Sequence, residues 1–317
     1  MQKAYIDTVR LLLDAAPAVF DGGVFAMKGG TAINLFVHDM PRLSVDIDLV
    51  YPDWSSPRDE ALRAIADEFA AIADRLKRFG LVARPVRVEG LGESKLLVER
   101  AGRGAEALVK IEVNLVFRGT VLPVERRALC ASVAEMFSAE VSVPTLAVDE
   151  LYGSKLVAAM DRQHPRDLFD VLRLYEEGID GARGLTDGMV ECFVLYLAGH
   201  NRPMDEVLAP RIDGGKKDLR LAYESSFAGL TREPVELSAL EAARERLFAE
   251  LPRRLTARQG RFLVGLARAE PDWSLVECPH AKDLPAIRWR LQNLVHFRET
   301  RPREWERQAA ALERALG

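Results

Sequence analysis

Cysteine and histidine are scarce in this chain of 317 residues, which has only three cysteines and five histidines. The cysteines are odd in number and far apart, so they predict buried or incidental thiols rather than a disulfide framework. The histidines do not cluster either, and we expect no zinc site. The scattered residues are Cys130, Cys192, Cys278, His38, His164, His200, His280 and His296.

Long apolar runs and a strong net charge are also missing. No run approaches the ~20 apolar residues that span a bilayer, and the first residues lack a signal-peptide pattern, so we expect a cytoplasmic protein without membrane contact. The formal net charge of −4 argues against a chain devoted wholly to nucleic-acid binding. Three basic clusters remain as candidate nucleic-acid contacts, at 216–220, 253–261 and 288–303, although acids are mixed into the last of them.

One segment, SVDIDL at 44–49, alternates polar and apolar residues. This period of two places Asp46 and Asp48 on one face of a strand and the apolar residues on the other. Two carboxylates on one rigid face can chelate a divalent cation, and phosphoryl and nucleotidyl transfer use one or two Mg²⁺ ions to clamp the attacking and leaving oxygens. Taken alone, such a pair more commonly marks the solvated face of a sheet.

A glycine pair lies upstream, in KGGT at 28–31. The pattern predicts a strand that ends at Met27, a break at the glycines and a helix from Thr31 to Val37. The helix N-terminus, the Lys28 side chain and the Thr31 hydroxyl would then surround a phosphate. A glycine pair alone is usually only a turn, but close before two carboxylates on a strand it predicts a nucleotide site.

A third candidate acid, Glu112, lies in the alternating segment LVKIEVNLV at 108–116. Lys110 and Glu112 share the polar face of this predicted strand. If the strand lies next to the one that carries Asp46 and Asp48, Glu112 reaches the same metal ions. It would act as a metal ligand or accept the proton of the attacking hydroxyl. The alternative is an ordinary polar outer face.

A further cluster begins at Lys155, on a predicted helix. Pro165 suits the first turn of a second helix, whose opening residues are Arg166 and Asp167. Lys155 would neutralise the charge of a triphosphate, while Asp167 would orient a base, a metal-bound water or the lysine itself. The alternative is a surface lattice of ion pairs, with Arg166 paired to Asp170 one turn on.

These segments together resemble the polymerase-beta-like nucleotidyltransferases. More narrowly, KGGTAINLF with RLSVDIDLVY resembles the AbiEii/AbiGii toxin family of abortive-infection and type IV toxin-antitoxin systems. The segment from Lys155 to Asp170 is similar to the third motif of that family. The gap between Gly30 and Asp46 is longer than in compact members of the superfamily, and this favours the narrower family. The resemblance covers the chain up to residue 170.

The resemblance implies a Mg²⁺-dependent nucleotidyltransferase, with Mn²⁺ as the alternative ion, that moves NMP from an NTP to RNA, such as the 3′ end of tRNA. It also implies a growth-arresting toxin, with a cognate antitoxin as a candidate partner. Two alternatives stay open: NMP transfer to a protein hydroxyl, and a non-catalytic module that binds a nucleotide or a partner. The predicted catalytic residues are Asp46, Asp48, Glu112, Lys155 and Asp167, of which the first three are also the predicted metal ligands. The predicted nucleotide-binding residues are Lys28, Gly29, Gly30, Thr31, Ser44 and Arg166.

The predicted fold is α+β, with two domains. We expect a nucleotidyltransferase-like mixed sheet flanked by helices over 1–147, and a helical domain over 148–317 that closes the active-site cleft. The predicted helices of the first part are 1–20 and 58–78, and its further predicted strands are 81–89, 94–100, 107–117 and 121–127. From about Val148 onward helical periods dominate, with breaks at 178–184, 213–215 and 271–272.

Overall fold

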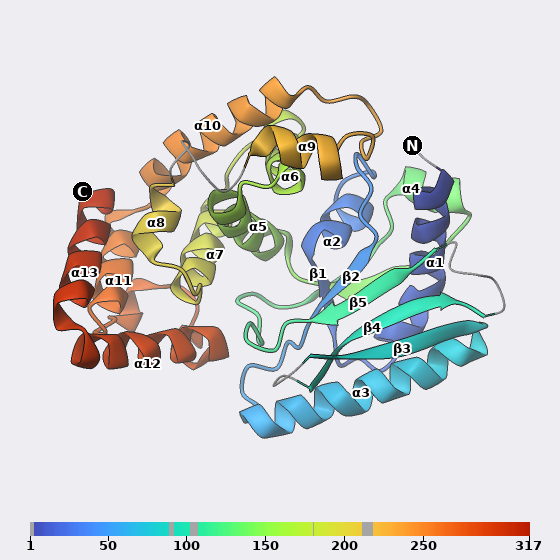
Figure 1. Ribbon diagram of the computed structural model, residues 1–317, viewed down its shortest axis with the longest axis horizontal. Coiled ribbons are helices and arrows are strands. Elements are labelled where there is room, and N and C mark those ends of the chain that lie inside the picture. The colour runs from blue at the N-terminus through green and yellow to red at the C-terminus, as the bar shows by residue number, and fades with distance from the viewer. Residues whose placement is uncertain (1–2, 89–91, 102–106, 180, 211–217) are drawn as a thin grey trace. The chain divides into compact units, whose positions relative to one another are not determined.

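The computed structural model describes residues 3–88, 92–101, 107–179, 181–210 and 218–317 of the chain (Figure 1). The chain divides into two compact units. Unit 1 comprises Met1–Ala147 and a returning segment, Gly229–Pro234, while unit 2 comprises Val148–Ala228 and Val235–Gly317. The break at 213–215 that the sequence predicts lies outside the described residues. No helix in the described ranges is long and apolar enough to cross a membrane.

Unit 1 contains a mixed sheet with the strand order β3-β4-β5-β2-β1-β7-β6. The pairs β2–β5 and β1–β7 are parallel, and the other neighbouring strands are antiparallel. This mixed sheet with flanking helices confirms the predicted α+β class. The elements are α1 (Lys3–Phe20), β1 (Ala26–Lys28), α2 (Gly29–Phe36), β2 (Asp46–Val50), α3 (Arg58–Arg78), β3 (Leu81–Val88), β4 (Gly92–Arg100), β5 (Val109–Val113), β6 (Glu125–Ala128), α4 (Ala131–Phe137) and β7 (Ser142–Thr145).

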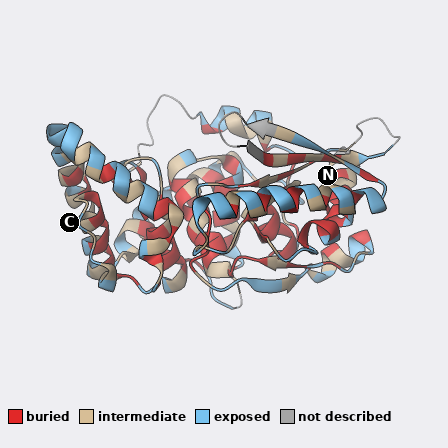
Figure 2. Cartoon of the chain, turned by 90° about the horizontal axis from the view of Figure 1, so that it is seen from below, coloured by how far each residue is buried: buried red, intermediate tan, exposed pale blue. Residues whose placement is uncertain are grey.

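The central strands owe their orientation to the period-two pattern of the sequence. In β2, Ile47 and Leu49 are buried while Asp46 and Asp48 are half-buried, and β5 alternates in the same way. Burying one such aliphatic side chain contributes about 1.5–3 kcal/mol, so the apolar face fixes which side of each strand faces the core. Figure 2 shows buried residues along the strands and the inner sides of the helices. The polar residues are therefore presented together on the other face.

The helix α3 has the residue pattern of an amphipathic helix that packs on a sheet. Acids lie in its first turn and basic residues in its last, where each complements the helix dipole. The helix packs against α1, β3 and β4 (Figure 1). Its buried residues recur every three or four positions, as one helical face requires, and they are Ala61, Ile65, Glu68, Phe69, Ile72 and Leu76.

Several elements of unit 1 differ from the sequence prediction. The strand predicted at 107–117 ends at Val113 because the Asn114 side chain accepts hydrogen bonds from the backbone N–H groups of Val116 and Phe117, which closes a turn. The helix predicted from Thr31 already begins at Gly29. The strand predicted at 121–127 is shorter and lies at 125–128, and the short elements α4 and β7 were not predicted.

The returning segment 229–234 belongs to unit 1 through backbone pairing. The N–H of Leu43 donates to the carbonyl of Leu230 at 2.8 Å, and the N–H of Arg232 donates to the carbonyl of Pro41 at 2.9 Å. Arg42 and Thr231 form the bridge between these bonds. A stretch distant in sequence thus fixes the loop that leads into β2.

Unit 2 is helical in the residues that the structure describes, as the sequence predicts. Its two first helices meet at Pro165, the position predicted to begin a new helix. The elements are α5 (Val148–Arg162), α6 (Pro165–Glu176), α7 (Asp187–Ala198), α8 (Met204–Leu208), α9 (Leu219–Ser226), α10 (Leu237–Arg254), α11 (Ala257–Ala267), the 3-10 turns η1 (Trp273–Leu275) and η2 (Ala281–Asp283), α12 (Pro285–Thr300) and α13 (Pro302–Leu316).

The packing of α5 against α7 in unit 2 depends on one glycine. A Cβ at Gly153 of α5 would lie 2.4 Å from the Cβ of Cys192 and 2.8 Å from the backbone nitrogen of Phe193, both in α7. Backbone atoms of a packed helix cannot move aside easily, so the contact requires the absence of a side chain.

We expect Gly153→Ala to lower the free energy of unfolding by about 1–3 kcal/mol, because the added methyl overpacks the α5–α7 contact. The matched control is Gly260→Ala in α11, where a Cβ would meet no atom within 4 Å. Alanine favours a helix over glycine, so this control should gain up to about 1 kcal/mol. Urea unfolding of both variants measures the difference, and equal stabilities would contradict the close contact.

Candidate active site

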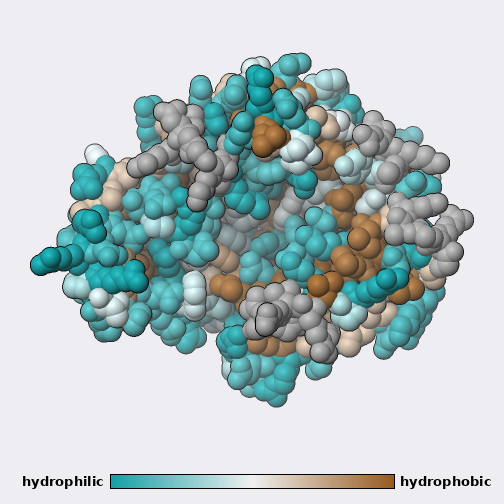
Figure 3. Space-filling model, viewed as in Figure 1, coloured by the Kyte–Doolittle hydropathy of each residue, from teal (hydrophilic) through white to brown (hydrophobic). Residues whose placement is uncertain are grey.

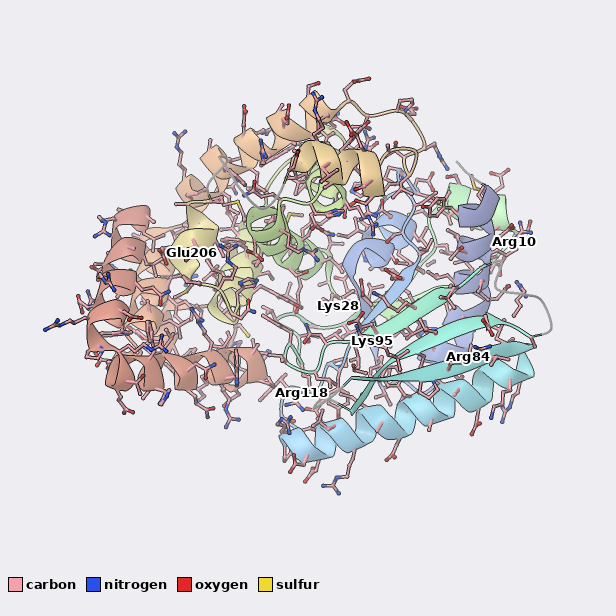
Figure 4. All side chains as sticks on the ribbon, in the orientation of Figure 1. Arg10, Lys28, Arg84, Lys95, Arg118 and Glu206 are labelled. Carbon is pink, nitrogen blue, oxygen red and sulfur yellow. The ribbon has the colours of Figure 1, made fainter. Side chains whose placement is uncertain are left out.

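The polar face of the sheet carries a row of four charged residues across four adjacent strands. The strand register aligns Lys95 of β4 with Glu112 of β5, and Glu112 with Asp48 of β2. Asp48 in turn aligns with Lys28 of β1. Aligned residues of neighbouring strands point to the same face of a sheet. Figure 4 labels Lys28 and Lys95, the two ends of this row. We call it the charged row.

Asp46 is a further acid on this face of β2. It aligns with Lys110 of β5, two residues before the Asp48–Glu112 pair. The face therefore holds Asp46, Asp48 and Glu112 on two parallel strands that are far apart in sequence. The juxtaposition of these strands is the arrangement that the sequence prediction required.

Glu112 is held by two lysines. Lys95 Nζ lies 3.0 Å from Oε1 of Glu112, and Lys110 Nζ lies 3.0 Å from Oε2. Lys110 Nζ also lies 3.8 Å from Oδ2 of Asp46. Burial raises the pKa of Glu112, but the hydrogen bonds from Lys95 and Lys110 outweigh this effect, so its pKa falls below the usual value. Glu112 is therefore ionised at neutral pH.

The donor atoms on this face suit a hard divalent cation. Carboxylate oxygens are the ligands that Mg²⁺ prefers, and the side chains of Asp46 and Glu112 are about one-third to two-fifths exposed, at 41% and 32%. Across the described ranges, no three His, Cys, Asp or Glu side chains lie close enough together to hold an ion. Asp46 and Asp48 can serve as ligands on the shared face of β2, whereas Glu112 must leave its lysines to join them.

The glycine pair at the start of α2 lies directly against the acids. Gly29 has φ of 77°, a conformation that favours glycine, and a Cβ there would lie 2.4 Å from Oδ2 of Asp48. A Cβ at Gly30 would lie 2.7 Å from Nη2 of Arg42 and 3.0 Å from Oγ of Ser44. The position of Gly29 therefore needs glycine, whereas a side chain at Gly30 would have to displace the ends of the Arg42 and Ser44 side chains. The N-terminus of α2 lies beside the Asp48 carboxylate.

Thr31 supports the acids from within the protein. Its hydroxyl donates to the backbone carbonyl of Asp46 at 2.5 Å and lies 3.0 Å from Oγ of Ser44. The residue is fully buried. Thr31 thus joins α2 to the start of β2 and fixes the position of the aspartates.

Three basic residues of this site were not assigned to it from the sequence. Arg42 is 98% buried and reaches Gly30 at the start of α2, where a positive charge would favour an anion. It lies in a loop, so no periodic pattern marks it. The sequence already placed Lys110 beside Glu112 on the polar face of a strand, and only its assignment to the site was missing. Lys95 could have been found in the same way, since it lies on the polar face of β4. Figure 3 shows hydrophobic residues among the hydrophilic ones at the surface. In unit 1, Val82 and Leu108 are among the large hydrophobic residues that are exposed.

The cluster at Lys155 is a buried ion network within unit 2. Lys155 Nζ lies 2.8 Å from Oδ1 of Asp167 and 2.9 Å from Oδ2 of Asp170. Nη2 of Arg162 lies 2.8 Å from Oδ2 of Asp167. The side chains of Lys155, Asp167 and Asp170 are 8%, 4% and 1% exposed, whereas that of Arg162 is 60% exposed.

This network differs from the ion-pair lattice considered for the sequence. Asp170 pairs with Lys155 rather than with Arg166. The Arg166 side chain is exposed and instead donates to the carbonyl of Ser226 at 3.4 Å. Its backbone N–H donates to Nδ1 of His164, which caps α6. The structure thus unites Lys155 and Asp167 but leaves Arg166 outside their network.

The buried charges control the protonation of Asp167. Burial raises the pKa of its carboxyl, but the charges of Lys155 and Arg162 outweigh burial, so the pKa lies below its usual value. Lys155 and Arg162 together therefore keep Asp167 charged in the interior.

The basic clusters of unit 2 are largely compensated by neighbouring acids. Arg298 lies 3.0 Å from Glu270, for example. Lys216 and Lys217 lie outside the described residues. Such pairs argue against an uncompensated cationic surface for nucleic acid at these clusters. Four of them are Arg254–Asp187, Arg258–Glu277, Arg298–Glu270 and Arg301–Glu304.

Comparison with known proteins shows the family to which the chain belongs. The family model described as nucleotidyl transferase AbiEii toxin, type IV TA system, matches residues 10–293. Because this match spans most of the chain, the protein belongs to the AbiEii family of nucleotidyltransferase toxins of type IV toxin-antitoxin systems.

A solved structure shares the fold over nearly the whole chain. It is MenT4, a nucleotidyltransferase toxin from Mycobacterium tuberculosis H37Rv, with a TM-score of 0.60 and 19% sequence identity. The superposition covers 92% of this chain and 95% of MenT4. None of the curated proteins searched matches the chain. The predicted family is therefore confirmed, and the family implies an NTP substrate.

We expect Asp167→Asn to lower the free energy of unfolding at pH 7 by about 3–5 kcal/mol, because it breaks a buried charge network. The folded-state pKa of Asp167 is lowered, so its charge stabilises the fold above the ordinary aspartate pKa, 3.8. That stabilisation is lost as the pH falls through the lowered folded-state pKa. The difference between the wild type and the variant should therefore shrink from pH 7 towards pH 2.

Urea unfolding across this pH range measures the effect. The matched control is Asp187→Asn, which removes a fully exposed carboxylate 2.8 Å from Arg254. It should leave the free energy of unfolding almost unchanged at every pH, because an exposed ion pair is screened by solvent. A constant difference between Asp167→Asn and the wild type would contradict the assigned charge state.

Proposed function

We propose that this nucleotidyltransferase moves NMP from an NTP to an RNA acceptor, the 3′ end of a tRNA, with Mg²⁺ or Mn²⁺ as cofactor. A tRNA extended in this way cannot be aminoacylated, so growth stops unless a cognate antitoxin prevents the transfer. The observation that carries the proposal is the alignment of Asp48 with Glu112, next to Asp46 and against the glycine pair. In this arrangement carboxylate oxygens lie beside the N-terminus of α2, which supports a site for a metal ion and a phosphate.

The carboxylates have separate roles in the proposal. A bound divalent ion would neutralise charge on the reacting phosphate. Asp46 and Asp48 would hold that ion from the rigid strand β2. Glu112 would complete the ligand set or accept the proton of the attacking hydroxyl, for which its ionised state is suited.

The donor NTP would bind at the start of α2. The free N–H groups of a helix N-terminus favour phosphate, and Gly29 and Gly30 permit close approach. Arg42 beside Gly30 adds a positive charge there. Lys28, at the β1 end of the charged row, is the second cation on this side. Ser44 and Thr31 contribute by fixing the strand and helix on which these groups lie.

Two roles for Lys155 and Asp167 follow from their buried network. In the first, Lys155 neutralises the charge of the triphosphate and of the leaving pyrophosphate, and Asp167 orients the lysine. In the second, the network only stabilises unit 2. Both fit a lysine between two aspartates, so kinetics rather than geometry must separate them. Arg166, which is exposed, remains a proposed phosphate contact.

The acceptor can be identified by labelling. The protein would be incubated with each α-³²P NTP in turn, Mg²⁺ and total bacterial RNA, and the RNA and protein fractions would be resolved in parallel. Label at RNA 3′ ends supports the proposal, whereas label in protein supports NMP transfer to a hydroxyl side chain. Absence of label with all four NTPs would support a non-catalytic binding module.

We expect Asp46→Ala or Asp48→Ala to reduce NMP transfer by about 10³-fold or more, since losing a metal ligand removes several kcal/mol of transition-state stabilisation. Stability should change by less than about 1 kcal/mol, because both residues lie on the open face of β2. Asp74→Ala, at an exposed acid of α3, is the control and should transfer normally. Wild-type turnover by the double variant would end the metal assignment.

We expect Lys155→Ala to raise the KM for NTP as well as lower kcat, because part of a charge contact with the triphosphate exists before the transition state. Initial rates over a range of NTP concentrations, with melting curves recorded in parallel, provide the test. Lys282→Ala, at an exposed residue of unit 2, is the control. Normal kinetics with a lower Tm would assign Lys155 to the structural role.

A further inference from the structure

The charged face of β5, β2 and their neighbours is electrically balanced by its own lysines. Three carboxylates, those of Asp46, Asp48 and Glu112, share the face with three ammonium groups from Lys28, Lys95 and Lys110. An ordinary metal-binding face carries an excess of negative charge that attracts the cation. Here the local sum of these formal charges is zero.

The balance is concentrated at Glu112. Each of its two carboxylate oxygens has its own ammonium partner at 3.0 Å, Lys95 on one side and Lys110 on the other. Lys110 also reaches towards Asp46, at 3.8 Å. A cation that bound Asp46 and Glu112 together would therefore compete with Lys110 for both acids.

Stability does not explain these two lysines. Their side chains are 33% and 36% exposed, and ion pairs in contact with solvent contribute only about 0–1 kcal/mol. Both residues lie on the polar phase of their strands, so either could be exchanged without disturbing the buried face. The position of both lysines around Glu112 therefore needs a functional explanation.

We propose that Lys95 and Lys110 are resident counter-ions of the metal site, which hold Glu112 until a divalent ion and a triphosphate bind together. A metal ion alone must displace the ammonium groups from Glu112 and leave them without an anion. A triphosphate supplies new anionic oxygens for the displaced lysines, so it lowers that cost. The inference rests on the proposed metal-dependent transfer. It adds that the metal ion and the NTP bind cooperatively.

Cooperativity of this kind can be measured without any turnover. If NTP raises the affinity for metal by some factor, metal must raise the affinity for NTP by the same factor. Couplings between sites typically amount to about 5- to 150-fold. We expect wild-type protein to bind Mn²⁺ weakly alone and at least about tenfold more tightly with a saturating α,β-methylene NTP analogue, which cannot be cleaved at the reacting bond.

The experiment is Mn²⁺ binding to the full-length protein followed by EPR, with and without the analogue, and the Mn²⁺ that the analogue chelates in protein-free solution is measured and subtracted. Lys95→Met with Lys110→Met should bind Mn²⁺ alone about tenfold more tightly than wild type, and the factor by which the analogue strengthens binding should fall to about threefold or less. Lys95→Arg with Lys110→Arg keeps both charges and should retain the wild-type coupling. The control is Lys77→Met, which removes an exposed lysine paired with Asp74.

The outcomes separate this inference from the proposed function. If the methionine variant folds and binds Mn²⁺ as wild type does, with unchanged coupling, the counter-ion role is wrong. If Asp46→Ala with Asp48→Ala retains Mn²⁺ binding, the metal assignment itself is wrong, whatever the lysines do. Circular dichroism of each variant establishes that the fold is intact, and the arginine variant tests the same point with the charges retained.

Discussion

The parallel pairing of β2 with β5 is the constraint on which this protein depends. It sets Ile47 beside Ile111 on the buried face and Asp48 beside Glu112 on the open one. A slip of one residue would move every carboxylate into the core and every aliphatic side chain to the surface. The hydrophobic effect on one face of the sheet thus fixes the chemistry on the other, and no separate interaction is needed to bring the acids together.

The sequence predicted those features that local pattern controls. Alternation within 44–49 and 108–116 gave the correct face for Asp46, Asp48 and Glu112, because side chains in a strand have a fixed period. The helix 58–78 was predicted with its observed bounds for a similar reason, since its apolar period and terminal charges are both local. The strand predicted at 107–117 was longer than the observed β5, because the side chain of Asn114 ends the strand pairing.

The remaining features depend on contacts between distant residues. Whether Lys95 meets Glu112 is decided by the pairing of β4 with β5, and one strand's sequence does not specify its neighbour. Lys155 was expected near Asp167, but its enclosure by two buried aspartates follows from the packing of α5 on α6. Arg42 lies in a loop without periodicity. Short elements such as α4 and β7 are stabilised by the sheet that they join rather than by their own propensity.

The segment 229–234, whose backbone pairs with the loop before β2, is synthesised long after that loop. A ribosome has completed all seven strands by residue 145, yet the partner of residues 41–43 has not been synthesised. At about 5–20 residues per second, that partner follows several seconds later. The nascent protein therefore carries its acidic strand before the loop leading into it is fixed, so an enzyme that would be toxic in the cell is completed only after much of its second unit has been translated.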